Sequence, residues 1–175
     1  MRELCVSGKR CPKMDTGGTR YTIILLMRVA VAADHAGFPL KDRILDEVRR
    51  LGYEPLDLGT HSTDPVDYPD CARAAAKSVT EGRAGRAILI CGSGAGAAVA
   101  ANKFRGIRAA TCHDVFSSHQ AVEDDDVNVM CLGARVVGPG LAVDLVRAYL
   151  GAKFSGLERH RRRLEKIARF EAEFG

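Results

Sequence analysis

The 175-residue chain has no tryptophan, and aromatic residues make up only 6% of it. Its six cysteines form no C-x-x-C pair and no regular spacing, which argues against a zinc ribbon or a disulfide scaffold. No apolar run approaches the ~20 residues of a membrane span, so we expect no membrane partner. Nor is there an internal repeat.

The 46% hydrophobic content predicts a packed core. The length fits one domain of about 150 residues and leaves no room for a separate cofactor domain.

The net charge of +4 is concentrated at the two ends of the chain. Residues 1–26 and residues 153–175 each carry three more basic than acidic side chains, whereas residues 27–152 carry 14 basic and 16 acidic ones. A nucleic-acid-binding domain usually spreads its basic residues over one face and mixes them with aromatic residues. We therefore expect no nucleic-acid partner.

Residues 1–26 differ from the rest because they show no hydrophobic period and contain several turn formers. The apolar residues 21–26, followed by the small residues 30–32, resemble a secretory signal with its cleavage site. Arg28 interrupts the apolar run, and cleavage there would remove a predicted strand. We interpret 1–26 as an extension outside the fold and 27–175 as the domain. Three cysteines end apolar runs, as packed free thiols of a cytoplasmic protein do: Cys91, Cys112 and Cys131.

From Met27 onward, short apolar runs alternate with helical patterns. The predicted strands are 28–33, 53–58, 87–91, 107–112 and 127–132. The predicted helices are 40–51, 72–79, 95–103, 115–122, 141–150 and 157–174. Strands that are apolar on both faces, each followed by a helix, indicate a parallel sheet covered on both sides. The fold class is therefore α/β: a single-domain three-layer α/β/α sandwich with a Rossmann-like, doubly wound sheet of about five strands.

The most informative turn is residues 91–96, Cys-Gly-Ser-Gly-Ala-Gly, directly after the third strand. Glycines at such a turn let backbone amides approach a ligand, and the following helix favours an anion there. Cys91 is either a nucleophile or general base at this edge, or a buried structural cysteine. Gly92, Gly94 and Ala97 also satisfy G-x-G-x-x-A, with Asp114 at the next strand end. A non-catalytic nucleotide-binding module is therefore an alternative function.

Two further groups could bind a phosphorylated ligand. Asp34 and His35 follow the first strand, where an imidazole could bind a phosphate oxygen or open a sugar ring. Their alternative roles are a helix cap and an exposed histidine. Arg159 and Arg163 are four residues apart on one helix face, so both could reach one phosphate, or they could belong to a solvated basic helix. The acidic run 123–126 is more typical of a solvated helix end than of a metal site.

Seven stretches make the chain resemble the type B ribose-5-phosphate isomerases, within the sugar-phosphate isomerase family that includes galactose-6-phosphate isomerase subunits. They run in order from Met27 to about Phe174: AADHAGFPLK (32–41), DLGTHS (57–62), DYP (67–69), LICGSGAG (89–96), AANKFRGIRA (100–109), NVMCLGARVVG (128–138) and GLERHRRR (156–163). Residues 1–26 match nothing in the family.

The resemblance implies an aldose–ketose isomerase of the pentose phosphate pathway. It would interconvert D-ribose 5-phosphate and D-ribulose 5-phosphate through a cis-enediolate, with no metal or other cofactor. Cys91 would be the base that moves a proton between C2 and C1. Some family members use a Glu six positions later, but that position is Ala97 here. The enediolate oxygen would be held by Ser93 and by the amides of Gly92, Gly94, Ala95 and Gly96.

The resemblance also assigns the remaining site residues and a partner. Asp34 and His35 would bind the sugar and assist ring opening. The phosphate would be held by Arg135, Arg159 and Arg163, with His160 beside them. The family is dimeric with active sites shared between two chains, so we expect a homodimer, with a tetramer as a further possibility.

This chain departs from the family at one catalytic position. The histidine to which ring opening is assigned is Asp124 here, followed by Asp125 at a substrate-binding position where Asn is frequent. A carboxylate is ionised at neutral pH, so it can act as a base but not readily as an acid. An alternative to ribose 5-phosphate is therefore another sugar phosphate substrate, such as allose 6-phosphate or a tetrose phosphate.

Overall fold

The computed structural model describes residues 27–174, whose centre is a parallel β-sheet. Its strands are β1 (Arg28–Ala33), β2 (Glu54–Asp57), β3 (Arg86–Cys91), β4 (Ala109–Thr111) and β5 (Val129–Gly133). They lie in the order β2-β1-β3-β5-β4, and every pair of neighbours is parallel. The predicted doubly wound parallel sheet is therefore confirmed.

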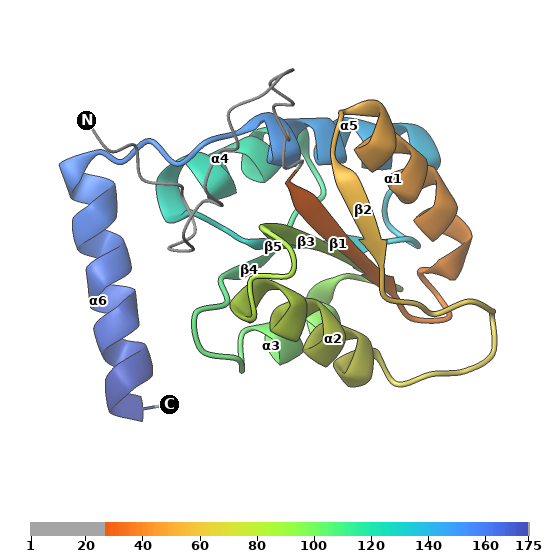
Figure 1. Ribbon diagram of the computed structural model, residues 1–175, viewed down its shortest axis with the longest axis horizontal. Coiled ribbons are helices and arrows are strands. Elements are labelled where there is room, and N and C mark those ends of the chain that lie inside the picture. The colour runs from red at the N-terminus through yellow and green to blue at the C-terminus, as the bar shows by residue number, and fades with distance from the viewer. Residues whose placement is uncertain (1–26, 175) are drawn as a thin grey trace, which may run out of the picture.

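Helices cover both faces of this sheet. They are α1 (Phe38–Arg50), α2 (Tyr68–Thr80), α3 (Ala95–Ala101), α4 (Val115–Asp125), α5 (Pro139–Gly151) and α6 (Glu158–Phe174). Figure 1 shows α1, α4 and α5 on one face and α2 and α3 on the other. The three-layer sandwich is thus confirmed, with α6 standing beside it.

The two faces of the sheet differ in side-chain size because alternate strand residues point to opposite sides. Larger side chains such as Val31, Ile88 and Leu132 pack under α1, α4 and α5. On the other face, small residues such as Ala30 and Ala32 pack against alanine-rich helices α2 and α3. The small residues allow these helices to approach closely, and this face also carries the side chain of Cys91.

The predicted elements are all present, but several boundaries were wrong. The predicted strands 107–112 and 127–132 are shorter or shifted, since Ile107 and Val127 are buried in loops and not in strands. Helix α2 begins at Tyr68, four residues before the predicted start at 72. Pro69 lies in its first turn, where the N–H that proline lacks has no helical partner.

Strand β1 also bears on the secretory-signal interpretation. It lies between β2 and β3, with the side chains from Val29 to Ala33 fully buried. Cleavage at the small residues 30–32 would remove this internal strand. The predicted extension, residues 1–26, lies outside the described part of the chain.

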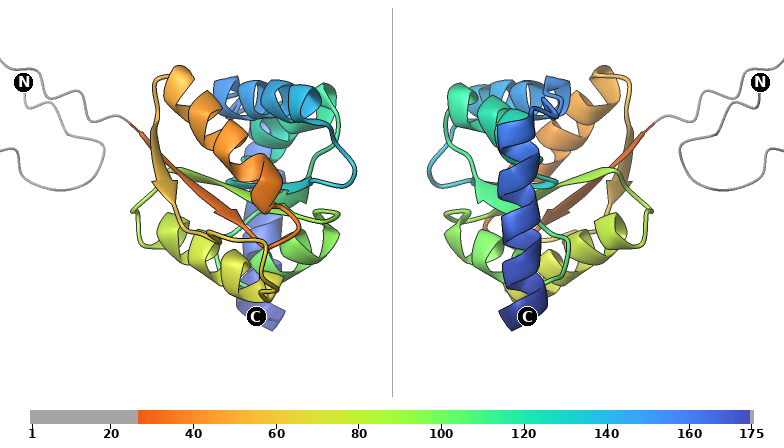
Figure 2. Two further views of the ribbon diagram at one scale, coloured as in Figure 1. Left: turned by 90° about the vertical axis from the view of Figure 1, so that its right-hand side faces the viewer. Right: turned by 90° about the vertical axis from the view of Figure 1, so that its left-hand side faces the viewer.

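Helix α6 has little contact with the rest of the fold. It packs near α4, and the carboxylate of Glu171 accepts hydrogen bonds from the Gly106 N–H at 2.9 and 3.1 Å. Figure 2 shows it from both sides as a long helix beside the sandwich. Its apolar residues Ile167, Phe170 and Phe174 are 46%, 58% and 80% exposed. This apolar surface is unpaired within the described residues of one chain.

An ion-pair network holds α1 against α5. The buried carboxylate of Glu47 accepts hydrogen bonds from Arg50 at 2.8 and 2.6 Å and from Arg147 of α5 at 2.8 Å. The hydrogen bonds from Arg50, with a smaller contribution from Arg147, outweigh the effect of burial and lower the pKa of Glu47 from 4.5 to about 2. Because the folded-state pKa is depressed, the stabilisation is complete above pH 4.5 and is lost as the pH falls toward 2.

We therefore expect Glu47→Gln to lower the free energy of unfolding by about 1–2 kcal/mol at pH 7. At about pH 3 the difference from the wild type should shrink to roughly half. Urea unfolding at both pH values measures it, with the exposed Asp42→Asn on the same helix as the control. An equal difference at both pH values would show that the ionised carboxylate is not responsible.

Candidate active site

The pocket that contains Cys91 lies at the point in the sheet where the strand order reverses. Strands β1 and β3 are neighbours, and the helices that follow them, α1 and α3, go to opposite faces. This switch point leaves a crevice at the carboxyl ends of the two strands, the usual place for a ligand in such sheets. The pocket measures about 360 Å³. Its lining residues are Asp34, His35, Ala36, Tyr68, Cys91, Gly92, Ser93, Gly96, Arg135 and Val136.

A larger hollow, of about 570 Å³, lies between α6 and the β4 edge. It is lined by apolar residues of α6 and by basic residues of the loop before β4, including Phe170, Arg105 and Arg108. It has no cysteine or histidine in its lining. We therefore place the chemistry in the smaller pocket.

Cys91 ends β3 and is only 5% exposed. Its sulfur accepts a hydrogen bond from the Gly94 N–H at 3.0 Å. Gly94 makes this turn possible because its φ is +81°, and a Cβ there would lie 2.9 Å from the Thr111 side chain. A backbone amide directed at the sulfur is the kind of contact that stabilises a thiolate.

The other cysteines in residues 27–174 are in different surroundings. All are free, and Cys91 is the one that lines the pocket. Burial raises the pKa of the thiols of Cys71, Cys112 and Cys131. None of these three lines the pocket, which leaves Cys91 as the candidate base.

Asp34 and His35 leave β1 at the edge of the pocket. Asp34 combines both roles considered for it, because one carboxylate oxygen accepts a hydrogen bond from the Gly37 N–H at 2.8 Å while the residue lines the pocket. The Nδ1 of His35 lies 3.2 Å from both the nitrogen and the oxygen of the Val66 backbone. The ring is therefore held through Nδ1, and Nε2 has no hydrogen-bond partner among the described residues.

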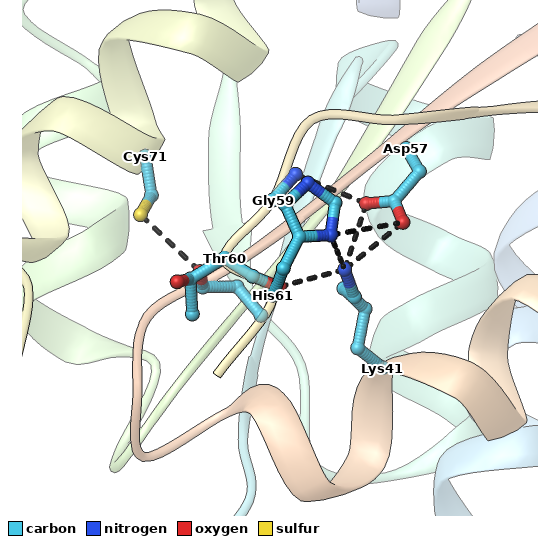
Figure 3. Close-up of polar contacts among 7 residues, drawn as sticks. Lys41, Asp57, Gly59, Thr60, His61 and Cys71 are labelled. Atoms are coloured by element: carbon cyan, nitrogen blue, oxygen red, sulfur yellow. Dashed lines mark hydrogen bonds and ion pairs between the residues drawn. The ribbon is translucent and has the colours of Figure 1, made fainter. Parts of the chain in front are cut away.

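A buried lysine supports this end of β1 (Figure 3). Lys41 Nζ donates to both carboxylate oxygens of Asp57, each at 2.9 Å, and to the Thr60 carbonyl at 2.7 Å. Although burial raises the pKa of Asp57, hydrogen bonds from Gly59 and Lys41 lower it overall. Residues 59 and 60 in turn pair with the Ala33 backbone at 2.8 and 2.7 Å. Lys41 thus fixes the loop that holds the strand end from which Asp34 and His35 extend.

The predicted oxyanion site is only partly available. Gly94 donates its amide to Cys91, and the Ala95 amide donates to Ser93 Oγ at 3.3 Å. Of the four amides named from the sequence, those of Gly92 and Gly96 remain as candidates, together with the Ser93 hydroxyl. This difference could not be seen in the motif, because it depends on how the turn folds back on itself.

Arg135 and Tyr68 complete the wall of the pocket. Arg135 follows β5, and its N–H donates to the Gly92 carbonyl at 3.0 Å, which holds the two loops together. Tyr68 is packed against Gly96, where an added Cβ would lie 2.9 Å from the ring. The sequence placed Arg135 in the site but assigned no role to Tyr68 or Lys41. Both residues lie within the stretches that resemble the isomerase family, and this resemblance was the sequence signal that could have pointed to them.

Apart from Gly94 and Ala95 in the turn itself, five predicted site residues do not line this pocket within one chain. They are Asp124 and Asp125 at the end of α4, and Arg159, His160 and Arg163 on α6. Figure 1 shows α6 beside the β4 edge, away from the arrowheads of β1 and β2. Of the three predicted phosphate-binding arginines, a single chain therefore brings only Arg135 to Cys91.

The nucleotide-binding alternative loses its acidic residue. Asp114 accepts a hydrogen bond from the Ser117 N–H at 2.7 Å and caps α4, so its side chain is already used within the fold.

Among residues 27–174 no group of three or more His, Cys, Asp or Glu could hold a metal ion. The absence of a cofactor stays a prediction. Within the same residues, no helix combines the length and the apolar character needed to cross a membrane.

Comparisons with known proteins agree with this geometry. A model of the family described as Ribose/Galactose Isomerase matches residues 29–167. Ribose-5-phosphate isomerase B of Escherichia coli (strain K12) is 42% identical over 146 residues, which span 83% of this chain and 97% of that protein. D-erythrulose-4-phosphate isomerase of Pectobacterium atrosepticum is 40% identical over 135 residues, which span 75% of this chain and 87% of that protein.

A solved structure is also similar. Ribose-5-phosphate isomerase B of Clostridium thermocellum superposes with a TM-score of 0.83 at 42% identity, covering 85% of this chain and 100% of that one. The family match over residues 29–167 includes residues of all five strands, the residues that line the pocket and the first part of α6.

Proposed function

The chain belongs to the ribose/galactose isomerase family of sugar-phosphate isomerases, and we propose that it interconverts D-ribose 5-phosphate and D-ribulose 5-phosphate. The observation that carries the proposal is Cys91, whose sulfur lies in the pocket at the switch point and accepts the Gly94 N–H. An aldose–ketose isomerisation needs one base that can remove a proton from C2 and return it to C1.

In the proposed reaction, the Cys91 thiolate takes the C2 proton of the open-chain aldose. The electrons of the C2–H bond form the C1–C2 double bond of a cis-enediolate, and the carbonyl oxygen on C1 becomes the oxyanion. The Ser93 hydroxyl and the amides of Gly92 and Gly96 are the groups available to stabilise it. A proton then moves from the hydroxyl on C2 to the oxygen on C1. When Cys91 returns its proton to C1, the C2–O bond becomes the carbonyl of the ketose. His35, held through Nδ1 by the Val66 backbone, is the candidate for ring opening.

We also propose that the working unit is a homodimer in which α6 of one chain completes the pocket of the other. Two observations support this. Within one chain, Arg159 and Arg163 lie outside the pocket, and α6 exposes Ile167, Phe170 and Phe174 over a hollow beside the β4 edge. A second copy would cover this apolar surface and bring its arginines to the phosphate.

We place the reaction in the cytoplasm. All four cysteines within residues 27–174 are free thiols, which is typical of a reducing compartment.

The second candidate is isomerisation of another sugar phosphate. One similar protein is named D-erythrulose-4-phosphate isomerase, and Asp124 stands where the resemblance expects a histidine. A comparison of kcat/KM for D-ribose 5-phosphate, D-allose 6-phosphate and D-erythrulose 4-phosphate separates the candidates. We expect the highest value with ribose 5-phosphate. A higher value with either other substrate would move the assignment to that sugar while keeping the reaction class.

A further inference from the structure

A buried histidine links the end of α4 to the start of α6, outside the Cys91 pocket. The side chain of His160 is only 2% exposed. Its Nδ1 lies 2.7 Å from Ser155 Oγ and 3.5 Å from a carboxylate oxygen of Asp124. Its Nε2 accepts a hydrogen bond from Arg159 Nε at 2.9 Å. Both ring nitrogens are therefore engaged, so His160 does not offer a nitrogen to a ligand.

These contacts determine where the ring proton lies. An arginine side chain is always protonated, so Nε of Arg159 is the donor and Nε2 of His160 must carry a lone pair. The ring proton is then on Nδ1, which faces Ser155 and the Asp124 carboxylate. A carboxylate on this side stabilises that tautomer and that ring orientation.

The same contacts constrain Arg159. Its Nε is used by His160, and its two terminal nitrogens make no hydrogen bond or ion pair within residues 27–174. Those nitrogens carry four N–H groups, which suit an incoming phosphate. The link is also anchored at the backbone, because the Ser155 N–H donates to the Glu123 carbonyl at 2.9 Å.

We propose that Asp124 is a positioning residue: through His160 it orients Arg159 to bind the substrate phosphate, and it does not transfer a proton to the sugar. This rests on the proposed function, in which Arg159 binds phosphate. Asp124 then has a function of its own in this chain, because its carboxylate pairs with the His160 ring in the tautomer that carries its proton on Nδ1. The carboxylate is 26% exposed, and its partner is the buried His160 ring.

The two roles for Asp124 predict different kinetics. If Asp124 positions Arg159, Asp124→Asn should raise KM for ribose 5-phosphate and Kd for inorganic phosphate by about tenfold, the effect of misplacing one charge-assisted hydrogen-bond donor. The kcat should stay within about twofold, and Asp124→Glu should restore part of the affinity. Glu123→Gln, which removes a neighbouring charge but keeps the carbonyl bonded to Ser155, should change neither. Steady-state kinetics and calorimetry with phosphate measure these values.

A structural readout completes the test. Long-range ¹H–¹⁵N spectra of the wild type should show His160 protonated on Nδ1, with its signal assigned from His160→Gln. In Asp124→Asn the His160 signals should shift. A fall in kcat with unchanged KM and phosphate affinity would overturn positioning in favour of proton transfer, and unchanged values of all three would also overturn it. A wild type that lacks isomerase activity, but whose phosphate affinity falls on Asp124→Asn, would contradict the proposed function and support the positioning role.

Discussion

Replacing Cys91 with alanine is expected to lower kcat for ribose 5-phosphate by at least about a thousandfold, since a positioned base contributes about 10²–10⁴. The change removes the sulfur that accepts the Gly94 amide, and no second thiol lines the pocket among the described residues. The fold should be kept, because a cysteine in a tightly packed strand end is replaced by a slightly smaller side chain. Initial rates and circular dichroism measure the two effects.

Cys131→Ala is the matched control for this loss. Cys131 is fully buried on the same face of the sheet, one strand away from Cys91, but it does not line the pocket. Its replacement should lower stability by a similar amount and leave kcat near that of the wild type. A Cys91→Ala variant that kept a tenth or more of the wild-type kcat would rule out the thiolate base.

Mixing two inactive variants is expected to restore activity if the active sites are shared. Cys91→Ala damages the pocket, whereas Arg159→Ala damages the arm that we propose to reach the partner's pocket. In a mixed dimer both defects fall on one site, and the other site is intact. Random re-pairing makes half of the dimers mixed, so about a quarter of wild-type activity should return. Each variant alone should have very low activity when ribose 5-phosphate is kept well below KM, because loss of Arg159 weakens phosphate binding.

The control for this experiment pairs Cys91→Ala with His35→Ala. Both residues line the same pocket of one chain, so each pocket in the mixed dimer carries one defect. No activity should return. Recovery with this pair, or no recovery with the Arg159 pair despite confirmed re-pairing, would contradict a site built from two chains.

Most of the fold could be predicted from periodicity alone. The apolar runs at 28–33 and 87–91 fell on β1 and β3, because a strand buried on both faces has no polar residue to obscure its limits. The limits of β4 and β5 could not be found in this way. Ile107 and Val127 are buried in loops, and a single sequence cannot distinguish a buried loop residue from a strand residue.

Most residues of the site could be predicted from the sequence, but many of the contacts between them could not. Cys91 ends β3 and Asp34 follows β1, and these strands proved adjacent, so the rule for parallel sheets placed the two residues together. The role of Lys41 depends on its contacts with Asp57 and Thr60, which are far from it in sequence. The contact between Asp124 and His160 likewise depends on how α6 leaves α5, which no motif specifies.

The most direct test of the proposed reaction is the rate of D-ribulose 5-phosphate formation from D-ribose 5-phosphate by the purified full-length chain, measured before and after treatment with EDTA. The proposed Cys91 mechanism predicts steady conversion to an equilibrium mixture at the same rate in both samples. No conversion, or conversion that stops with EDTA and returns with a divalent metal, would contradict it.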